Sequence, residues 1–170
     1  TKNLPNVRKI ERVLPKDVFP ELSHEVKTVA IFVGAHKEFS KEETDAIELF
    51  CEQYNGVVFV DYTSNYHGRY KVQNALLACQ NDQRLMRHPD LLIHIGEVSG
   101  EIYNTYHIFS KQTWRVSEDG EIRDLFKNLY KVFQMDEFSF FSHYGNVSTQ
   151  NKDLSFCEYF KSVYQDLLTK

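Results

Sequence analysis

The chain has 170 residues, of which 42% are hydrophobic and 14% aromatic, and its formal net charge is −4. This length suits one domain with a substantial core, and the aromatic content excludes an intrinsically disordered chain. The weak negative charge, without long blocks of like charge, excludes a nucleic-acid partner. No apolar run approaches the roughly 20 residues of a membrane-spanning helix, and residues 1–25 lack a signal-peptide pattern, so we expect a cytoplasmic protein with no membrane partner.

The first part of the chain divides into an arm and a strand. Residues 1–24 are polar and interrupted by prolines, which predicts a linker or an extended arm. Residues 27–33 (KTVAIFV) form a short apolar run rich in β-branched side chains and closed by Gly34. Such a run is typical of a strand that is buried on both faces.

A helix is predicted to follow this strand. Ser40 and Glu43 have the spacing of a capping box, in which each side chain binds a free backbone N–H of the first helical turn. Apolar side chains then recur at helical spacing from Ala46 to Tyr54. Asn55 and Gly56 supply a left-handed helix end.

The same succession of strand, loop and helix repeats downstream. We expect further strands at 57–60, 91–95, 113–116 and 130–135, and further helices at 72–79 and from about residue 100 to 109. Alternation of this kind predicts a three-layer Rossmann-like α/β domain, with a parallel sheet of about five to six strands and helices on both faces. The three cysteines, Cys51, Cys79 and Cys157, are widely spaced and are expected to be reduced and buried.

An amphipathic helix is expected near the C-terminus. Between Leu154 and Leu167 the apolar side chains follow steps of three and four. The helix lies outside the repeating pattern, so its apolar stripe either folds back onto the domain or docks on a neighbour.

The candidate binding crevice lies beyond the carboxyl ends of the strands, where open parallel sheets bind their ligands. Three loops supply its residues: Gly34, Ala35 and His36; Asp61, Thr63 and Ser64; and Gly96, Glu97 and Ser99.

None of these loops carries a complete catalytic or phosphate-binding motif. A single glycine, Gly34, stands where a dinucleotide fingerprint needs three, and Ser99 lies in GxxSG rather than the GxSxG of hydrolases. His36, His67 and Asp61 could converge as a metal or acid–base site, but separate exposed loop groups are the simpler interpretation. We therefore assign no catalytic residue and no metal ligand.

Three stretches together resemble a known family. They are VAIFVGAHKEFSKEETDAIELFCEQYNGVVFVDYTSNYHG at 29–68, HPDLLIHIGEVSG at 88–100 and TWRVSEDGEIRDLF at 113–126. In this order they resemble the central domain of thiamine-diphosphate-dependent enzymes. The nearest branch contains the menaquinone-pathway synthase of 2-succinyl-5-enolpyruvyl-6-hydroxy-3-cyclohexene-1-carboxylate, and acetolactate synthase-like enzymes share the domain.

The resemblance implies residues 25–142 as the central domain, 1–24 as the linker into it and 143–170 as the helical segment leading out. It also implies a non-catalytic, structural and interdomain role within a 2-oxo-acid decarboxylase or synthase. The partners would be the flanking domains that bind thiamine diphosphate and Mg²⁺, in a homo-oligomeric parent. Some members bind FAD or ADP in this domain, but the single glycine after the first strand argues against flavin here. The alternative function is a nucleotide or small-molecule binding module that uses the loops at the carboxyl ends of the strands.

Overall fold

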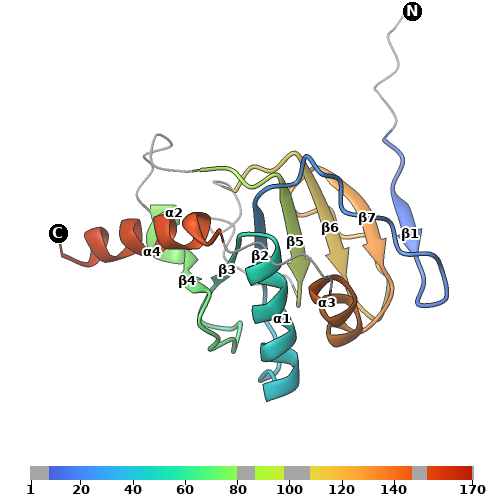
Figure 1. The fold of residues 1–170 in the computed structure, drawn as a ribbon, viewed down its shortest axis with the longest axis horizontal. Helices are drawn as coiled ribbons and strands as arrows, with labels where there is room; N and C mark the ends of the chain where they lie inside the picture. Colours follow the sequence, from blue (N-terminus) through green and yellow to red (C-terminus); the bar gives the residue numbers. More distant parts are fainter. Residues whose placement is uncertain (1–7, 80–86, 98–107, 147–152, 170) are drawn as a thin grey trace, which may run out of the picture.

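A seven-stranded parallel sheet forms the centre of the molecule (Figure 1). The computed structural model describes residues 8–79, 87–97, 108–146 and 153–169. The strand order is β1-β7-β6-β5-β2-β3-β4, and every neighbouring pair is parallel. The strands are β1 (Glu11–Val13), β2 (Val29–Val33), β3 (Gly56–Val60), β4 (Lys71–Gln73), β5 (Leu91–Ile95), β6 (Gln112–Val116) and β7 (Leu129–Phe133).

The predicted Rossmann-like α/β architecture is confirmed, with slightly more strands than expected. Every residue of β2, β3 and β5 is buried, which agrees with apolar strands covered on both faces. The two extra strands are short strands at the sheet edges. β1 lies in the segment expected to be a linker or arm, and it pairs with β7 through the register Glu11↔Lys131. β4 occupies the start of the helix expected at 72–79, so that α2 (Asn74–Cys79) begins two residues later.

Two helices cover one face of the sheet. α1 (Lys41–Gln53) and α3 (Glu137–Gly145) lie side by side in Figure 1 and pack against each other. The ring of Phe50 in α1 lies 5.2 Å from that of Phe141, and Phe140 packs on Phe133 of β7 at 4.8 Å. The capping box predicted for α1 is present. Asn55, which follows the last residues of α1, takes the left-handed conformation predicted for the end of this helix (φ 50°). α3, in contrast, is not expected from the sequence.

α4 (Ser155–Leu168) packs on the opposite face. Strand residues alternate between faces, and directly paired residues of neighbouring strands share a face. Gly56 of β3 faces α1, because a Cβ there would meet Cys51, and Phe59, three residues further, therefore points to the other face. It contacts Phe160 of α4 with ring centroids 5.0 Å apart. The first part of α4 thus folds back onto the domain, while its C-terminal end extends beyond β4 in Figure 1.

Some sequence-based expectations concern residues that the structure does not describe. The helix expected from about residue 100 falls largely within 98–107, outside the described residues, as does Ser99. Cys51 and Cys157 are buried and free. Among the described helices, none has the length and apolar character needed to cross a membrane.

The strand order creates one topological switch point. From β2 the chain builds outward through β3 and β4, and it then returns to place β5 on the other side of β2. In sheets of this kind the crevice beyond the carboxyl ends of the two central strands is the usual ligand position. That position is occupied here by the loops that follow Val33 and Ile95.

Candidate functional site

Backbone hydrogen bonds close the switch point itself. Ala35 and Glu97 form an isolated antiparallel bridge, with N–H to carbonyl distances of 2.9 Å in both directions, and the N–H of Gly34 donates to Ile95 at 2.9 Å. A Cβ on Gly34 would overlap the carbonyl oxygen of Glu97, and Gly96 has a φ of +72°. The two glycines therefore let the loops meet, and the role of Gly34 is close packing rather than approach to a phosphate.

The second candidate loop forms a turn that is satisfied by its own hydrogen bonds. The carboxylate of Asp61 accepts from the N–H and hydroxyl of Thr63, both at 2.7 Å. The hydroxyl of Ser64 donates to the carbonyl of Val33 at 2.6 Å, which ties this turn to the end of β2. These side chains stabilise the loop after β3. The side chain of His67, in contrast, is exposed to solvent. The possible convergence of His36, His67 and Asp61 is not formed.

A cavity of about 380 Å³ lies beside the closed switch point, at the carboxyl ends of β2, β5, β6 and β7. Four of the nine sequence-predicted crevice residues line it: Ala35, His36, Gly96 and Glu97. Gly34, Asp61, Thr63 and Ser64 do not. The part of the wall that follows β6 and β7 was not predicted from the sequence, and it includes Arg115, Ser117, Glu118, Asp119, Asp136 and Glu137.

The contacts of His36 favour its charged form. Its Nε2 lies 2.8 Å from the carboxylate of Glu137, its Nδ1 lies 2.6 Å from the carbonyl oxygen of Lys37, and its ring stacks on Phe39 at 4.0 Å. The Lys37 carbonyl and the Glu137 carboxylate can both accept hydrogen bonds, which favours a proton on each ring nitrogen. Burial opposes this charge, but the hydrogen bond and ion pair with Glu137 outweigh it and raise the pKa of His36 above its usual value.

Arg115 of β6 is the buried cation of this site. Its side chain is fully buried, and its Nη1 donates to the carbonyl of Gly96 at 3.2 Å and faces Nδ1 of His94 at 3.3 Å. Burial and the nearby positive charges of Arg115 and Arg123 lower the pKa of His94 to about 3, so His94 is neutral and Nδ1 is the acceptor. The other two guanidinium nitrogens, Nε and Nη2, are buried without a hydrogen-bond partner among the described residues.

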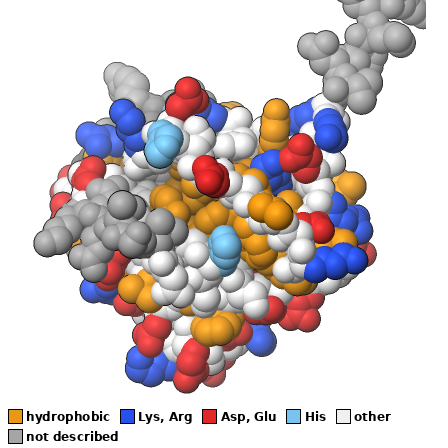
Figure 2. All heavy atoms as spheres, turned by 45° about the vertical axis from the view of Figure 1, so that its right-hand side comes forward, with side chains coloured by type: hydrophobic (Ala, Val, Ile, Leu, Met, Phe, Trp, Pro, Cys, Tyr) orange, Lys and Arg blue, Asp and Glu red, His pale blue; other side chains and the backbone are white. Residues whose placement is uncertain are grey.

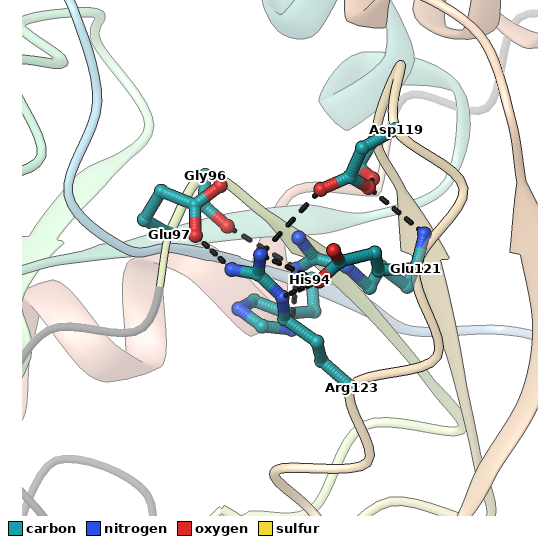
Figure 3. Close-up of polar contacts among 8 residues, drawn as sticks. His94, Gly96, Glu97, Asp119, Glu121 and Arg123 are labelled. Atoms are coloured by element: carbon teal, nitrogen blue, oxygen red, sulfur yellow. Dashed lines mark hydrogen bonds and ion pairs between the residues drawn. The ribbon is translucent and has the colours of Figure 1, made fainter.

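A second arginine fixes the loop after β6 (Figure 3). Nε and Nη2 of Arg123 donate to the carboxylate of Glu121 at 2.9 and 2.7 Å, and Nη1 binds the carboxylate of Glu97. Asp119 lies 3.5 Å from the same guanidinium and accepts from the backbone N–H of Glu121. Hydrogen bonding to Ser117 and Glu121 lowers the pKa of Asp119. Unlike Arg115, Arg123 is therefore already paired with carboxylates.

The wall of the cavity carries more acidic than basic groups. Lys37 pairs with Glu43 at 3.3 Å, and His36 pairs with Glu137, whereas Glu118 is exposed on the rim. The carboxylates are dispersed, because no cluster of three or more potential metal ligands occurs within the described ranges. The carboxylates along the wall can accept hydrogen bonds from donor groups of a small molecule.

Comparison with known proteins adds no assignment. No protein-family model matches the chain, and a search of the curated proteins finds no significant relative.

Proposed function

We propose that this chain is a non-catalytic central domain of a thiamine-diphosphate-dependent enzyme that decarboxylates a 2-oxo acid, with a structural and interdomain role. The observation that supports a non-catalytic role is the closed switch point, where the Ala35–Glu97 bridge joins the two loops at the usual ligand position of a Rossmann-like sheet. The charged groups beside it support the same interpretation, because His36, Lys37 and Arg123 are engaged with carboxylates.

The fold and the surface also favour such a role. Apart from β1, the strand order is that of a doubly wound nucleotide-binding sheet, the architecture expected of this central domain. Apolar side chains form a band across the face shown in Figure 2. Large exposed apolar areas mark surfaces that contact other domains or proteins, so this face suits contact with a flanking domain.

Cofactor chemistry belongs, in this proposal, to the flanking domains of a cytoplasmic, homo-oligomeric parent. The described residues of this chain do not fit thiamine diphosphate and Mg²⁺, because they offer no glycine-rich phosphate loop and no cluster of metal ligands. We assign this chain no step of the reaction.

Two measurements test the proposal. The 170-residue protein, mixed with thiamine diphosphate, Mg²⁺ and pyruvate, should release no CO₂ above the blank without protein. Turnover above that blank would contradict a non-catalytic role. In enzymes of this family a glutamate of the N-terminal domain activates the cofactor ring, and a GDG…N motif of the C-terminal domain holds Mg²⁺ and the diphosphate. The neighbouring coding sequence should therefore encode such a glutamate upstream and such a motif downstream. A gene that lacks both would overturn the assignment to a thiamine-diphosphate enzyme.

A further inference from the structure

We infer that the groove between the starts of α1 and α3 is a docking site for a basic segment of a partner protein. The groove has a volume of about 590 Å³. Its lining includes two aromatic and four charged side chains: Phe39, Phe138, Lys37, Glu38, Glu42 and Glu43. The inference goes beyond the proposed function, because it identifies a surface of this chain and the chemistry of the partner that fits it.

Two aromatic side chains supply the apolar part of the groove. Phe138 is 45% exposed, on a helix whose other phenylalanines are buried in the core. Phe39 is half-buried, and its ring is held in place by stacking on His36 at 4.0 Å and by an edge contact with Tyr66 at 5.4 Å. Aromatic side chains are enriched in protein interfaces, where they anchor side chains of the partner. The groove therefore offers a fixed ring and an exposed ring to a partner.

The charged side chains of the groove leave an excess of negative charge. Lys37 pairs with Glu43 at 3.3 Å, and Lys41 at the start of α1 pairs with an aspartate one turn further along. Glu38 and Glu42 are both exposed, and neither forms an ion pair within the described ranges. The basic groups near the groove are thus engaged, while two of its carboxylates are available to a cation.

The neighbouring cavity extends this negative surface. It shares two wall residues with the groove, and it adds the exposed carboxylates of Glu118 and Asp136, which form no ion pair in the part of the chain that the structure describes. The positive groups beside it do not balance them, because His36 and Arg123 are bound to carboxylates and Arg115 is buried. Charges of one sign along a common surface attract a partner of the opposite sign and speed its association.

Charge and aromatic surface together favour a basic protein segment over other occupants. A second copy of the chain would bring the same acidic groove, and like charges across an interface oppose association. Phosphates of nucleic acids and anionic lipids are repelled for the same reason. Arginine, in contrast, binds carboxylates through its guanidinium group and stacks on aromatic rings, so it matches both parts of the groove. Apolar side chains of the same segment can cover Phe138.

The test is an NMR titration of the ¹⁵N-labelled 170-residue protein with the peptide GRLRFLRG, blocked at both ends. GELEFLEG reverses its charges, GRSRSSRG keeps the charges without the apolar side chains, and spermine is a polycation that is not a peptide. With the first peptide we expect saturable shifts of the backbone signals around Phe39 and Phe138. GRSRSSRG and spermine should bind at least about fivefold more weakly, and GELEFLEG should give no shift.

An aromatic pair of variants locates the apolar contact. Phe138→Ala should weaken the binding of GRLRFLRG by about fivefold or more, because it removes the exposed ring of the groove. Tyr130→Ala truncates an aromatic side chain of similar exposure on β7, outside the groove, and should bind like the wild type. Both side chains are about half exposed, so both variants should fold, which their spectra show directly.

A second pair tests the charges. Glu38→Gln combined with Glu42→Gln should weaken binding by about threefold or more, whereas Glu21→Gln combined with Glu25→Gln makes the same change of net charge at exposed positions outside the groove and should have little effect. The inference is overturned by an absence of shifts up to about 5 mM GRLRFLRG. Equal binding of GRSRSSRG, GELEFLEG or spermine, or equal effects of a variant pair and its control, would overturn it as well.

Discussion

His36 is the residue through which pH acts on this site. Its pKa is raised because the hydrogen bond and ion pair with Glu137 outweigh the effect of burial. The imidazolium is therefore favoured in the folded state, and its contribution to stability is complete below the unfolded pKa of about 6.5 and is lost as the pH rises through the raised folded value.

We expect the free energy of unfolding to fall between pH 6 and pH 8.5 by more in the wild type than in Glu137→Gln, where the charge partner is removed. Urea denaturation at both pH values measures this difference. NMR titration of the ring should give His36 a lower pKa in Glu137→Gln than in the wild type. An unchanged pKa would show that Glu137 does not hold the proton on His36.

Gly34 supports a second prediction at the scale of a single residue. A methyl group at this position would overlap the backbone oxygen of Glu97, which cannot move without breaking the bridge to Ala35. Gly34→Ala should therefore destabilise the protein by about 1–3 kcal/mol, as overpacking does in other cores. Glu38→Ala, at an exposed position of the same loop, should change stability by about 0.5 kcal/mol or less. Equal effects of the two changes, measured by urea denaturation, would mean that the loops are not in contact.

Among the elements, the central strands were predictable because each is apolar on both faces. β2, β3 and β5 are short runs of large apolar residues, and burial on both sides is the arrangement in which such runs are stable. β1 and β4 were missed because they are three-residue edge strands with one buried residue each. α3 was missed because its aromatic residues are so dense that the buried positions, Phe140, Phe141 and Tyr144, do not stand out as a stripe.

The candidate site was only half predictable, for a topological reason. The loops after β2 and β5 could be proposed as a crevice from the repeating pattern alone. Arg115 and Glu137 enter the site only because β6 and β7 follow β5 in the sheet, which brings their carboxyl ends to the same cavity. The one signal in the sequence was a charged residue inside the apolar strand TWRV. A buried arginine is uncommon unless it is paired, so it could have been proposed as functional.

The position of β2 inside the sheet, between β5 and β3, gives a prediction at the scale of elements. Ile31 is fully buried and paired with Val58 on one side and Ile93 on the other. Ile31→Ala should lower the free energy of unfolding by about 2–5 kcal/mol, because the cavity it leaves is enclosed by two neighbouring strands. Val18→Ala, at a side chain that is 95% exposed, serves as the control and should have little effect. Similar losses in urea denaturation would contradict the central place of β2.

At the scale of the whole molecule, α4 joins the far end of the chain to the sheet. Its first turn is anchored by Asn55, whose side-chain oxygen accepts from the N–H of Phe156 at 2.9 Å, and Phe160 is buried against Phe59. Further along, Leu168 is 57% exposed. Val163, Tyr164 and Leu167 are partly buried against the core, so α4 keeps one face on the domain and turns Leu168 to the solvent.

This division of α4 predicts two different responses to the same kind of truncation. Phe160→Ala removes a ring that packs between the sheet and Phe156, and it should cost about 3–5 kcal/mol. Leu168→Ala removes an exposed side chain and should cost about 0.5 kcal/mol or less in the isolated protein. Hydrogen exchange should show the same contrast, with slow amides around Phe160 and fast ones near Leu168. Equal protection along the helix, together with equal losses of stability, would mean that the end of α4 contributes as much to the fold as its first turns.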